Sequence, residues 1–159
     1  MFKTIKKDWS FIIPTTLIFL FSLTITVVDF IIFQSYKFKI NVFSILGIIL
    51  FIIGFLLRQY CKKVLSKYYS YGLQTSNEHK LIKTGIYKYI RHPIYAAMLI
   101  YTPAIPLVFS SLYGFIIMLI IIPFVLYRIN IEEKMLAKQF GKEYEDYVKT
   151  TKKLIPFLL

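Results

Sequence analysis

Residues 11–33 read FIIPTTLIFLFSLTITVVDFIIF, a run of 23 residues in which Asp29 is the only charged side chain. A second run, residues 40–57 (INVFSILGIILFIIGFLL), has 18 residues and no charge. A bilayer core of about 30 Å needs roughly 20 helical residues, with a range of about 17–25. Both runs are long enough to cross a membrane, so this half of the chain predicts two transmembrane helices.

Two shorter apolar runs follow. Residues 94–110 carry Pro103 and Pro106, and residues 112–127 carry Pro123. In the strands of a membrane barrel, apolar and polar residues alternate. They do not alternate in either of these runs, so helices are expected. A buried helical hairpin of a water-soluble protein is the alternative, but four such runs leave too little polar sequence to cover them. We therefore expect an all-α integral membrane bundle of about four transmembrane helices, with short cytoplasmic helices after the last span.

The composition excludes several other classes of protein. Hydrophobic residues make up 57% of the 159 residues, which argues against a disordered tail. The formal charge of +12 is spread between apolar runs, unlike the single water-facing surface of a soluble nucleic-acid-binding module. The one cysteine, Cys61, excludes an intramolecular disulfide and a multi-cysteine metal site. We expect no nucleic-acid partner and no metal.

The basic residues predict the orientation of the helices. Eighteen of the 20 Lys and Arg lie before the first run, in residues 58–92 or in residues 128–159, and the other two lie in residues 34–39. The positive-inside rule then places both termini and the two long polar segments, residues 58–92 and 128–159, in the cytoplasm. Anionic lipids would also attract these segments. The short connections 34–39 and 110–111 predict antiparallel hairpins for helices 1–2 and 3–4, within one domain that covers the whole chain.

The first run is not expected to be a cleaved signal peptide. Lysines precede it, as they precede a signal, but the small residues of a cleavage site are missing, and the first alanine of the chain is Ala96. We interpret it as a retained membrane helix.

Helix geometry brings the polar segments together. With a turn near Ser110, His92 and Arg128 both lie 18 residues from the turn, so both are roughly 27 Å from it along their helices. The alternative is that these charges only reach the lipid headgroups or solvent at the membrane boundary. We expect five side chains to converge at the cytoplasmic end of this hairpin: Arg91, His92, Arg128, Glu132 and Glu133.

The polar segment before the third run is also informative. It reads Lys83-Thr-Gly-Ile-Tyr-Lys-Tyr-Ile-Arg-His-Pro-Ile-Tyr95. Gly85 allows a tight turn or the close approach of a ligand to the backbone. Pro93 suits the first turn of a helix, whose free N–H groups bind anions. At least one of its tyrosines is expected in an interfacial aromatic belt rather than in a site.

After the fourth run the chain predicts two more helical stretches. Ile131, Met135, Leu136 and Phe140 form an apolar stripe, and Gly141 fits a helix C-terminus. A short helix with Tyr144, Tyr147 and Val148 on one side follows, and we interpret these three residues as packing or membrane-surface residues.

Two blocks of sequence stand out on either side of the last two apolar runs. The first block is Gly-x-Tyr…Arg-His-Pro-x-Tyr, with Gly85, Tyr87, Arg91, His92, Pro93 and Tyr95. The second block is Arg-x-x-x-Glu-Glu-x-x-Leu-x-x-x-Phe-Gly-x-x-Tyr-x-x-Tyr, from Arg128 to Tyr147. Together they resemble the isoprenylcysteine carboxyl methyltransferase family and the related small phospholipid-methyltransferase-like membrane enzymes. The resemblance covers about residues 78–156, and the first two helices match only in being apolar.

The resemblance implies S-adenosylmethionine-dependent methyl transfer to a lipophilic acceptor delivered from the bilayer, with carboxyl O-methylation of an isoprenylcysteine-like substrate as the leading reaction. It implies catalytic roles for Arg128, which would orient the acceptor, and for Glu133. The cofactor-binding residues that it implies are Lys83, Thr84, Gly85, Ile86, Tyr87, Arg91, His92, Pro93, Tyr95, Glu132 and Glu133.

The chemistry of a carboxylate acceptor fits these residue types. A carboxylate needs no general base, only a bidentate arginine and a pocket that removes its hydration. Three alternatives remain open: N-methylation of a phospholipid amine with Glu132 or His92 as the base, a non-catalytic membrane scaffold, and an NADPH-dependent membrane reductase. Asp29 is expected at the opposite side of the membrane, outside the site.

Overall fold

The computed structural model describes residues 9–32, 38, 40–65 and 81–155. In these ranges the only β pairing is an isolated parallel bridge between Ile90 and Lys152, so the predicted all-α class is confirmed. In chain order, the helices are α1 (Trp9–Ile32), α2 (Val42–Leu65), the 3₁₀ helix η2 (Gly85–Lys88), α3 (Pro93–Val108), α4 (Leu112–Leu119), α5 (Ile121–Phe140) and α6 (Lys142–Thr150).

Three helical segments of the described chain are long and apolar enough to cross a membrane. They are α1, α2 and the segment Leu112–Phe140, which joins α4 to α5. The helix α3 is apolar but has only 16 residues. The chain is thus an integral membrane protein, and a fourth span through α3 stays a prediction.

Two helices extend beyond the predicted membrane spans. The second helix continues past residue 57 to Leu65, and α5 continues through residues 127 and 128 to Phe140. The stripe expected in a separate tail helix therefore belongs to α5, which also carries the end of the last apolar run, and α6 follows it as a separate short helix. The helical segment is instead interrupted at Ile120, between α4 and α5. Pro123 has no N–H to donate to the Leu119 carbonyl, so the regular hydrogen bonding of the helix is lost there.

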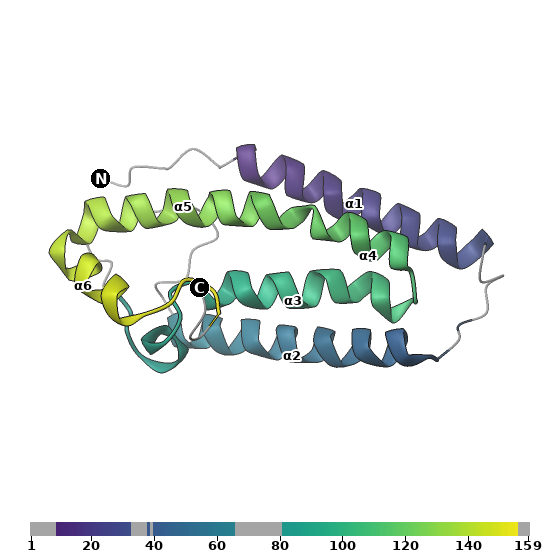
Figure 1. The fold of residues 1–159 in the computed structure, drawn as a ribbon, viewed down its shortest axis with the longest axis horizontal. Helices are drawn as coiled ribbons and strands as arrows, with labels where there is room; N and C mark the ends of the chain where they lie inside the picture. Colours follow the sequence, from purple (N-terminus) through teal and green to yellow (C-terminus); the bar gives the residue numbers. More distant parts are fainter. Residues whose placement is uncertain (1–8, 33–37, 39, 66–80, 156–159) are drawn as a thin grey trace.

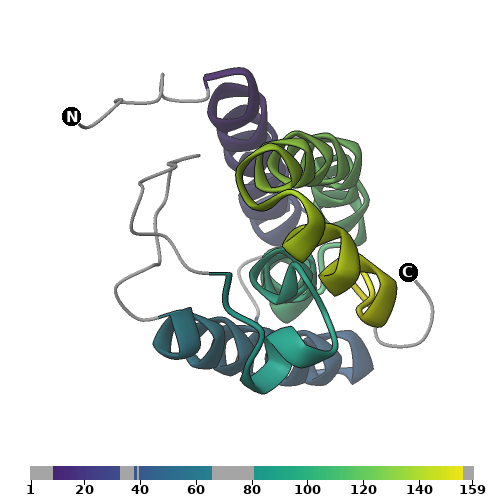
Figure 2. The same cartoon turned by 90° about the vertical axis from the view of Figure 1, so that its left-hand side faces the viewer.

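The helices stack in one order across the bundle (Figures 1 and 2). The first helix packs against α4 and α5, α3 packs against α4, and α2 packs on the other side of α3. The predicted hairpin of α3 and α4 about Ser110–Ser111 is confirmed. The prediction that helices 1 and 2 pack as a hairpin was wrong, because α3 lies between the layers of α1 and α2. Most of their connection, residues 33–37 and 39, lies outside the described residues.

Small residues allow α2 and α3 to approach closely. Gly47, Gly54 and Cys61 recur every seven residues on the buried face of α2. A Cβ atom at Gly47 would lie 2.5 Å from the Val108 backbone nitrogen, and one at Gly54 would lie 2.8 Å from the Tyr101 backbone nitrogen. The two backbones therefore touch, as they do where small residues drive association of membrane helices.

Gly54→Leu is expected to lower the free energy of unfolding by about 3 kcal/mol, since no side chain at this position avoids the α3 backbone. Thermal unfolding in detergent measures the effect. The matched control is Ile52→Leu, at an exposed position of the same helix, with an expected change within about 0.5 kcal/mol. Equal stability of the two variants would contradict the tight α2–α3 contact.

Polar contacts fix the far end of the bundle. The Ser22 hydroxyl of α1 donates to the Gly114 carbonyl of α4 at 2.8 Å. The Ser44 and Ser110 hydroxyls are 2.8 Å apart, and Ser110 also donates to the Asn41 side-chain oxygen at 3.1 Å. These contacts hold the α3–α4 turn against α1 and the start of α2. These contacts therefore fix the positions of α3 and α4, the two helices that lead from the turn toward the opposite end of the bundle.

Candidate functional site

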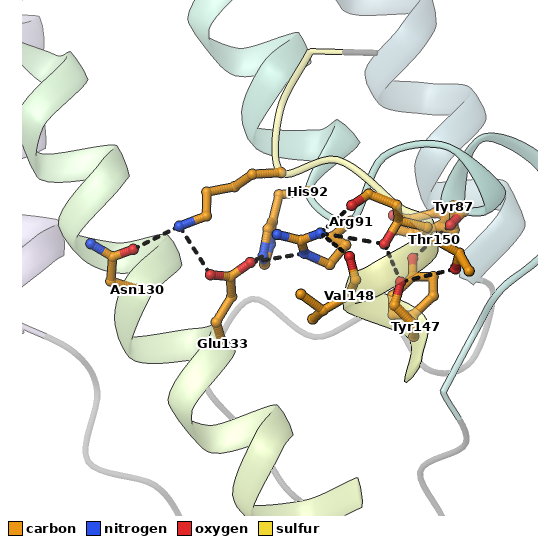
Figure 3. Close-up of polar contacts among 10 residues, drawn as sticks. Tyr87, Arg91, His92, Asn130, Glu133, Tyr147, Val148 and Thr150 are labelled. Atoms are coloured by element: carbon orange, nitrogen blue, oxygen red, sulfur yellow. Dashed lines mark hydrogen bonds and ion pairs between the residues drawn. The ribbon is translucent and has the colours of Figure 1, made fainter. Parts of the chain in front are cut away.

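Polar side chains from four segments meet at the end of the bundle opposite the α3–α4 turn. They come from the η2–α3 connection, the polar part of α5, α6 and the residues after α6 (Figure 3). The five side chains expected to converge lie in two groups. The Glu133 cluster consists of Arg91, His92, Asn130, Glu133 and Lys153, and the Arg128 cluster consists of Phe11, Tyr95, Arg128 and Glu132.

Three basic side chains surround the Glu133 carboxylate. Arg91 Nε donates to Glu133 Oε1 at 2.9 Å, and His92 Nε2 lies 3.4 Å from the same oxygen. Lys153 Nζ lies 3.0 Å from Glu133 Oε2 and donates to Asn130 at 3.0 Å. The side chains of Arg91 and His92 are almost fully buried. Glu133 thus joins α5 to the start of α3 and to the segment after α6 (Figure 3).

Backbone hydrogen bonds hold that last segment beside the start of α3. The Arg91 N–H donates to the Lys152 carbonyl at 2.8 Å, and the His92 N–H donates to the Lys153 carbonyl at 3.1 Å. The Arg91 guanidinium also donates to the Thr151 carbonyl. Lys153 was not among the predicted site residues, because no local pattern indicates that a residue 61 positions after His92 lies beside it.

A hydrogen bond from Tyr147 connects α6 to the η2 turn. Its hydroxyl donates to the Tyr87 carbonyl at 2.6 Å, and its own carbonyl accepts from Thr151 Oγ1 at 2.6 Å. Burial raises the pKa of Tyr147 to about 12, an effect that the nearby Arg91 only partly offsets. The phenol therefore stays protonated and remains a donor at neutral pH, which agrees with the packing role expected for this residue.

The sequence predicts a packing role for Tyr144, but its hydroxyl group indicates a further role. Its side chain is 3% exposed, yet its hydroxyl has no hydrogen-bond partner among the described residues. Burial, and next the negative charge of Glu133, raise the pKa of Tyr144 above its ordinary value. A buried neutral hydroxyl beside the Glu133 cluster is a donor that a ligand could satisfy. The Phe-Gly-x-x-Tyr pattern is the sequence signal that could have indicated this residue as part of the site.

Arg128 is buried, with 5% of its surface exposed. Its Nε donates to the Tyr95 hydroxyl at 3.4 Å, and that hydroxyl donates to Glu132 Oε2 at 2.9 Å. The guanidinium carbon lies 5.4 Å from the centre of the Phe11 ring on α1. These neighbours orient a planar group that can bind a carboxylate through two hydrogen bonds.

The predicted cofactor loop, residues 83–87, lies against α2 and α6. Lys83 pairs with Glu143 at 2.9 Å, but both side chains are largely exposed and the pair contributes little stability. Gly85 has a φ of +59°, which confirms the expected turn, and a Cβ there would lie 3.1 Å from the Tyr60 hydroxyl. Thr84 is exposed and Ile86 is half-buried.

Pro93 is the first residue of α3, as expected, and is fully buried. The structure thus brings Arg91, His92 and Glu133 into one cluster and Tyr95, Arg128 and Glu132 into the other. The described contacts of Lys83 and Gly85 lie apart from both clusters, on α6 and α2. Across the residues that the structure describes, no group of three His, Cys, Asp or Glu side chains is arranged to hold a metal ion.

Comparison with known proteins identifies one family. Residues 47–138 match the profile of the isoprenylcysteine carboxyl methyltransferase (ICMT) family. The protein-S-isoprenylcysteine O-methyltransferase of Saccharomyces cerevisiae is 30% identical over 127 residues, which cover 78% of this chain and 53% of the yeast protein. A probable protein-S-isoprenylcysteine O-methyltransferase of Oryza sativa subsp. indica is 29% identical over 118 residues, which cover 72% of this chain and 62% of the rice protein.

The fold is similar to a solved structure of the eukaryotic intramembrane Ras methyltransferase ICMT. The TM-score is 0.79 with 25% sequence identity, and the match covers 98% of this chain and 55% of that protein. The chain therefore spans between half and two thirds of the length of these relatives. The matched family region contains both Arg91 and Glu133, so it includes the ion pair that joins α3 to α5.

Proposed function

The chain belongs to the isoprenylcysteine carboxyl methyltransferase family, and we propose that it is a membrane S-adenosylmethionine-dependent methyltransferase of a lipophilic acceptor. The proposed acceptor is the carboxylate of an isoprenylcysteine-like group, as the names of the relatives indicate. The observation that carries the proposal is the meeting of the two family blocks, through Arg91 and Glu133 in one cluster and Tyr95 and Arg128 in the other.

The proposed cofactor site contains the groups that S-adenosylmethionine requires. Glu133 offers a carboxylate to the ammonium group of the cofactor. The tyrosine rings of the proposed site can stack on the adenine or contact the sulfonium. The Tyr144 hydroxyl is a buried donor without a partner among the described residues. Lys153 is the Glu133 partner that an ammonium could replace, since its side chain is 32% exposed. The residues proposed to hold the cofactor are Lys83, Thr84, Gly85, Ile86, Tyr87, Arg91, His92, Pro93, Tyr95, Glu132, Glu133 and Tyr144.

Arg128 is proposed to orient the acceptor. When bound, S-adenosylmethionine supplies an already activated methyl group. The protein then needs to hold the acceptor carboxylate in line with that methyl group and to exclude water. The buried Arg128 guanidinium can hold the carboxylate, since Tyr95 fixes one edge of it. Glu132 in turn fixes the Tyr95 hydroxyl. No protein base is required for an ionised carboxylate.

The membrane orientation is part of the proposal. Both termini and the site end of the bundle would face the cytoplasm, as the distribution of basic residues predicts. The cofactor would then arrive from water and the acceptor from the bilayer, and the whole chain would act as a single domain.

The first test is calorimetric binding of S-adenosylmethionine to the detergent-purified protein, with NADPH as the control ligand. We expect binding of S-adenosylmethionine only. Binding of NADPH alone would favour a membrane reductase, and binding of neither by folded protein would favour a scaffold.

An acceptor comparison then tests the reaction. We expect methyl transfer to N-acetyl-S-farnesylcysteine and none to its methyl ester or to phosphatidylethanolamine. Transfer to phosphatidylethanolamine instead would assign the chain to amine N-methylation, for which Glu132 or His92 would be the base.

Tyr144→Phe is expected to weaken S-adenosylmethionine binding about fivefold, the effect of one hydrogen bond, without lowering the melting temperature. Tyr147→Phe is the matched control on the same helix: it removes the 2.6 Å bond to the Tyr87 carbonyl and should lower stability by about 1 kcal/mol. Calorimetry and thermal unfolding measure the two effects. Unchanged affinity in Tyr144→Phe would remove this residue from the proposed cofactor site.

A further inference from the structure

Phe11 of the first helix lies at the proposed reaction centre. Phe11 lies near the start of α1, and its ring centre is 5.4 Å from the guanidinium carbon of Arg128 on α5. The ring is half-buried and packs against the apolar cluster of Ile121, Val125, Ile129 and Leu154. Its position is therefore set by packing as well as by the arginine.

Phe11 and Tyr95 are two of the contacts that hold the guanidinium. An aromatic ring within about 6 Å attracts a cation to its face, and the attraction is strongest where water is excluded. Arg128 is buried, so this condition holds. The arginine Nε also donates to the Tyr95 hydroxyl at 3.4 Å. The ring and the hydroxyl together restrict the orientation of the guanidinium, with which a carboxylate has to align.

The surroundings of Phe11 connect this contact with the bilayer. On α1, its neighbours Trp9, Ile12 and Ile13 are exposed apolar residues, which face lipid in a membrane helix. An acceptor that leaves the bilayer beside α1 would pass close to Phe11, which contacts Arg128. Residue 11 lies outside the matched family region, residues 47–138, so the family comparison assigns it no role.

We propose that Phe11 is a positioning residue: its ring holds the Arg128 guanidinium in the orientation that receives the acceptor carboxylate, and α1 thereby forms one side of the acceptor site. This inference rests on the proposed methyltransferase function. It extends the acceptor site to a helix that the two family blocks do not include.

The test compares Phe11→Leu, which keeps an apolar side chain without a π face, with Phe11→Trp, which keeps the π face. The control is Leu17→Ala, at an exposed position of the same helix. In detergent or vesicles, Phe11→Leu should lower kcat/KM for N-acetyl-S-farnesylcysteine about tenfold, whereas Phe11→Trp should stay within about threefold of the unsubstituted protein. The dissociation constant for S-adenosylmethionine should be unchanged in all three variants.

The outcomes separate a positioning role from packing. If Phe11→Leu and Phe11→Trp lose activity equally, or if both weaken S-adenosylmethionine binding and lower the melting temperature, the ring only packs α1 and the inference is overturned. Full activity of Phe11→Leu also overturns it and leaves the proposed function intact. Lack of turnover by the unsubstituted, S-adenosylmethionine-binding protein overturns both, which distinguishes the two failures.

Discussion

Arg128→Ala is expected to lower kcat/KM for a carboxylate acceptor by about 10²–10³-fold and to leave S-adenosylmethionine affinity within about twofold. The physical reason is that the guanidinium is buried and oriented by Tyr95 and Phe11. Without it, the acceptor carboxylate would lose both its counter-charge and its alignment with the methyl group.

Arg128→Lys sharpens this test. Lysine keeps the positive charge but lacks the planar fork, so kcat/KM should fall about tenfold to a hundredfold if two-point binding matters. The control is Lys134→Ala, an exposed position on the same helix, for which we expect no change. Thermal unfolding of each variant shows whether the fold is retained, and a folded Arg128→Lys protein with normal turnover would exclude the proposed role.

Glu133→Gln is expected to weaken S-adenosylmethionine binding at least about tenfold and to destabilise the protein by about 2 kcal/mol. The loss should be smaller than the roughly 3–5 kcal/mol for breaking a fully buried ion pair, because 19% of the Glu133 side chain is exposed. The substitution removes the negative charge that Arg91 and Lys153 share. Calorimetry measures the first effect and thermal unfolding the second.

The control for Glu133 is Glu143→Gln. Glu143 also forms an ion pair, with Lys83 at 2.9 Å, but both side chains are largely exposed, so its loss should change stability by less than about 0.5 kcal/mol. If Glu133→Gln loses stability but binds S-adenosylmethionine normally, Glu133 is a structural residue that orients Arg91 and His92. The assignment of Glu133 to the cofactor would then be wrong.

The apolar runs predicted the helices well because lipid imposes a simple requirement on the chain. A segment that crosses a bilayer needs about 20 apolar residues with every backbone hydrogen bond satisfied internally, and this requirement is visible in residues 11–33 and 40–57 directly. The apolar runs did not indicate where the helices end. The polar residues after 57 and after 127 continue their helices to Leu65 and Phe140, since Lys, Arg and Glu are themselves good helix formers.

The convergence of the site could also be predicted. The equal spacing of His92 and Arg128 from the turn at Ser110 placed both at one end of the bundle, and the observed Arg91–Glu133 and Tyr95–Arg128 contacts confirm that placement. The equal spacing did not indicate which basic residue meets which carboxylate. Similar lengths of helix fix a common depth, but the pairing depends on the rotation of each helix about its axis.

The amino-acid sequence by itself therefore determined the membrane helices, the α3–α4 hairpin and the end of the molecule at which the polar residues gather, because these follow from local periodicity and spacing. Only the tertiary structure decided the partners of those residues. Lys153 reaches Glu133, Tyr147 reaches the Tyr87 carbonyl, and Phe11 covers Arg128. Each of these contacts joins residues at least 20 positions apart, and they form because helix packing, not the local chain, sets which faces meet.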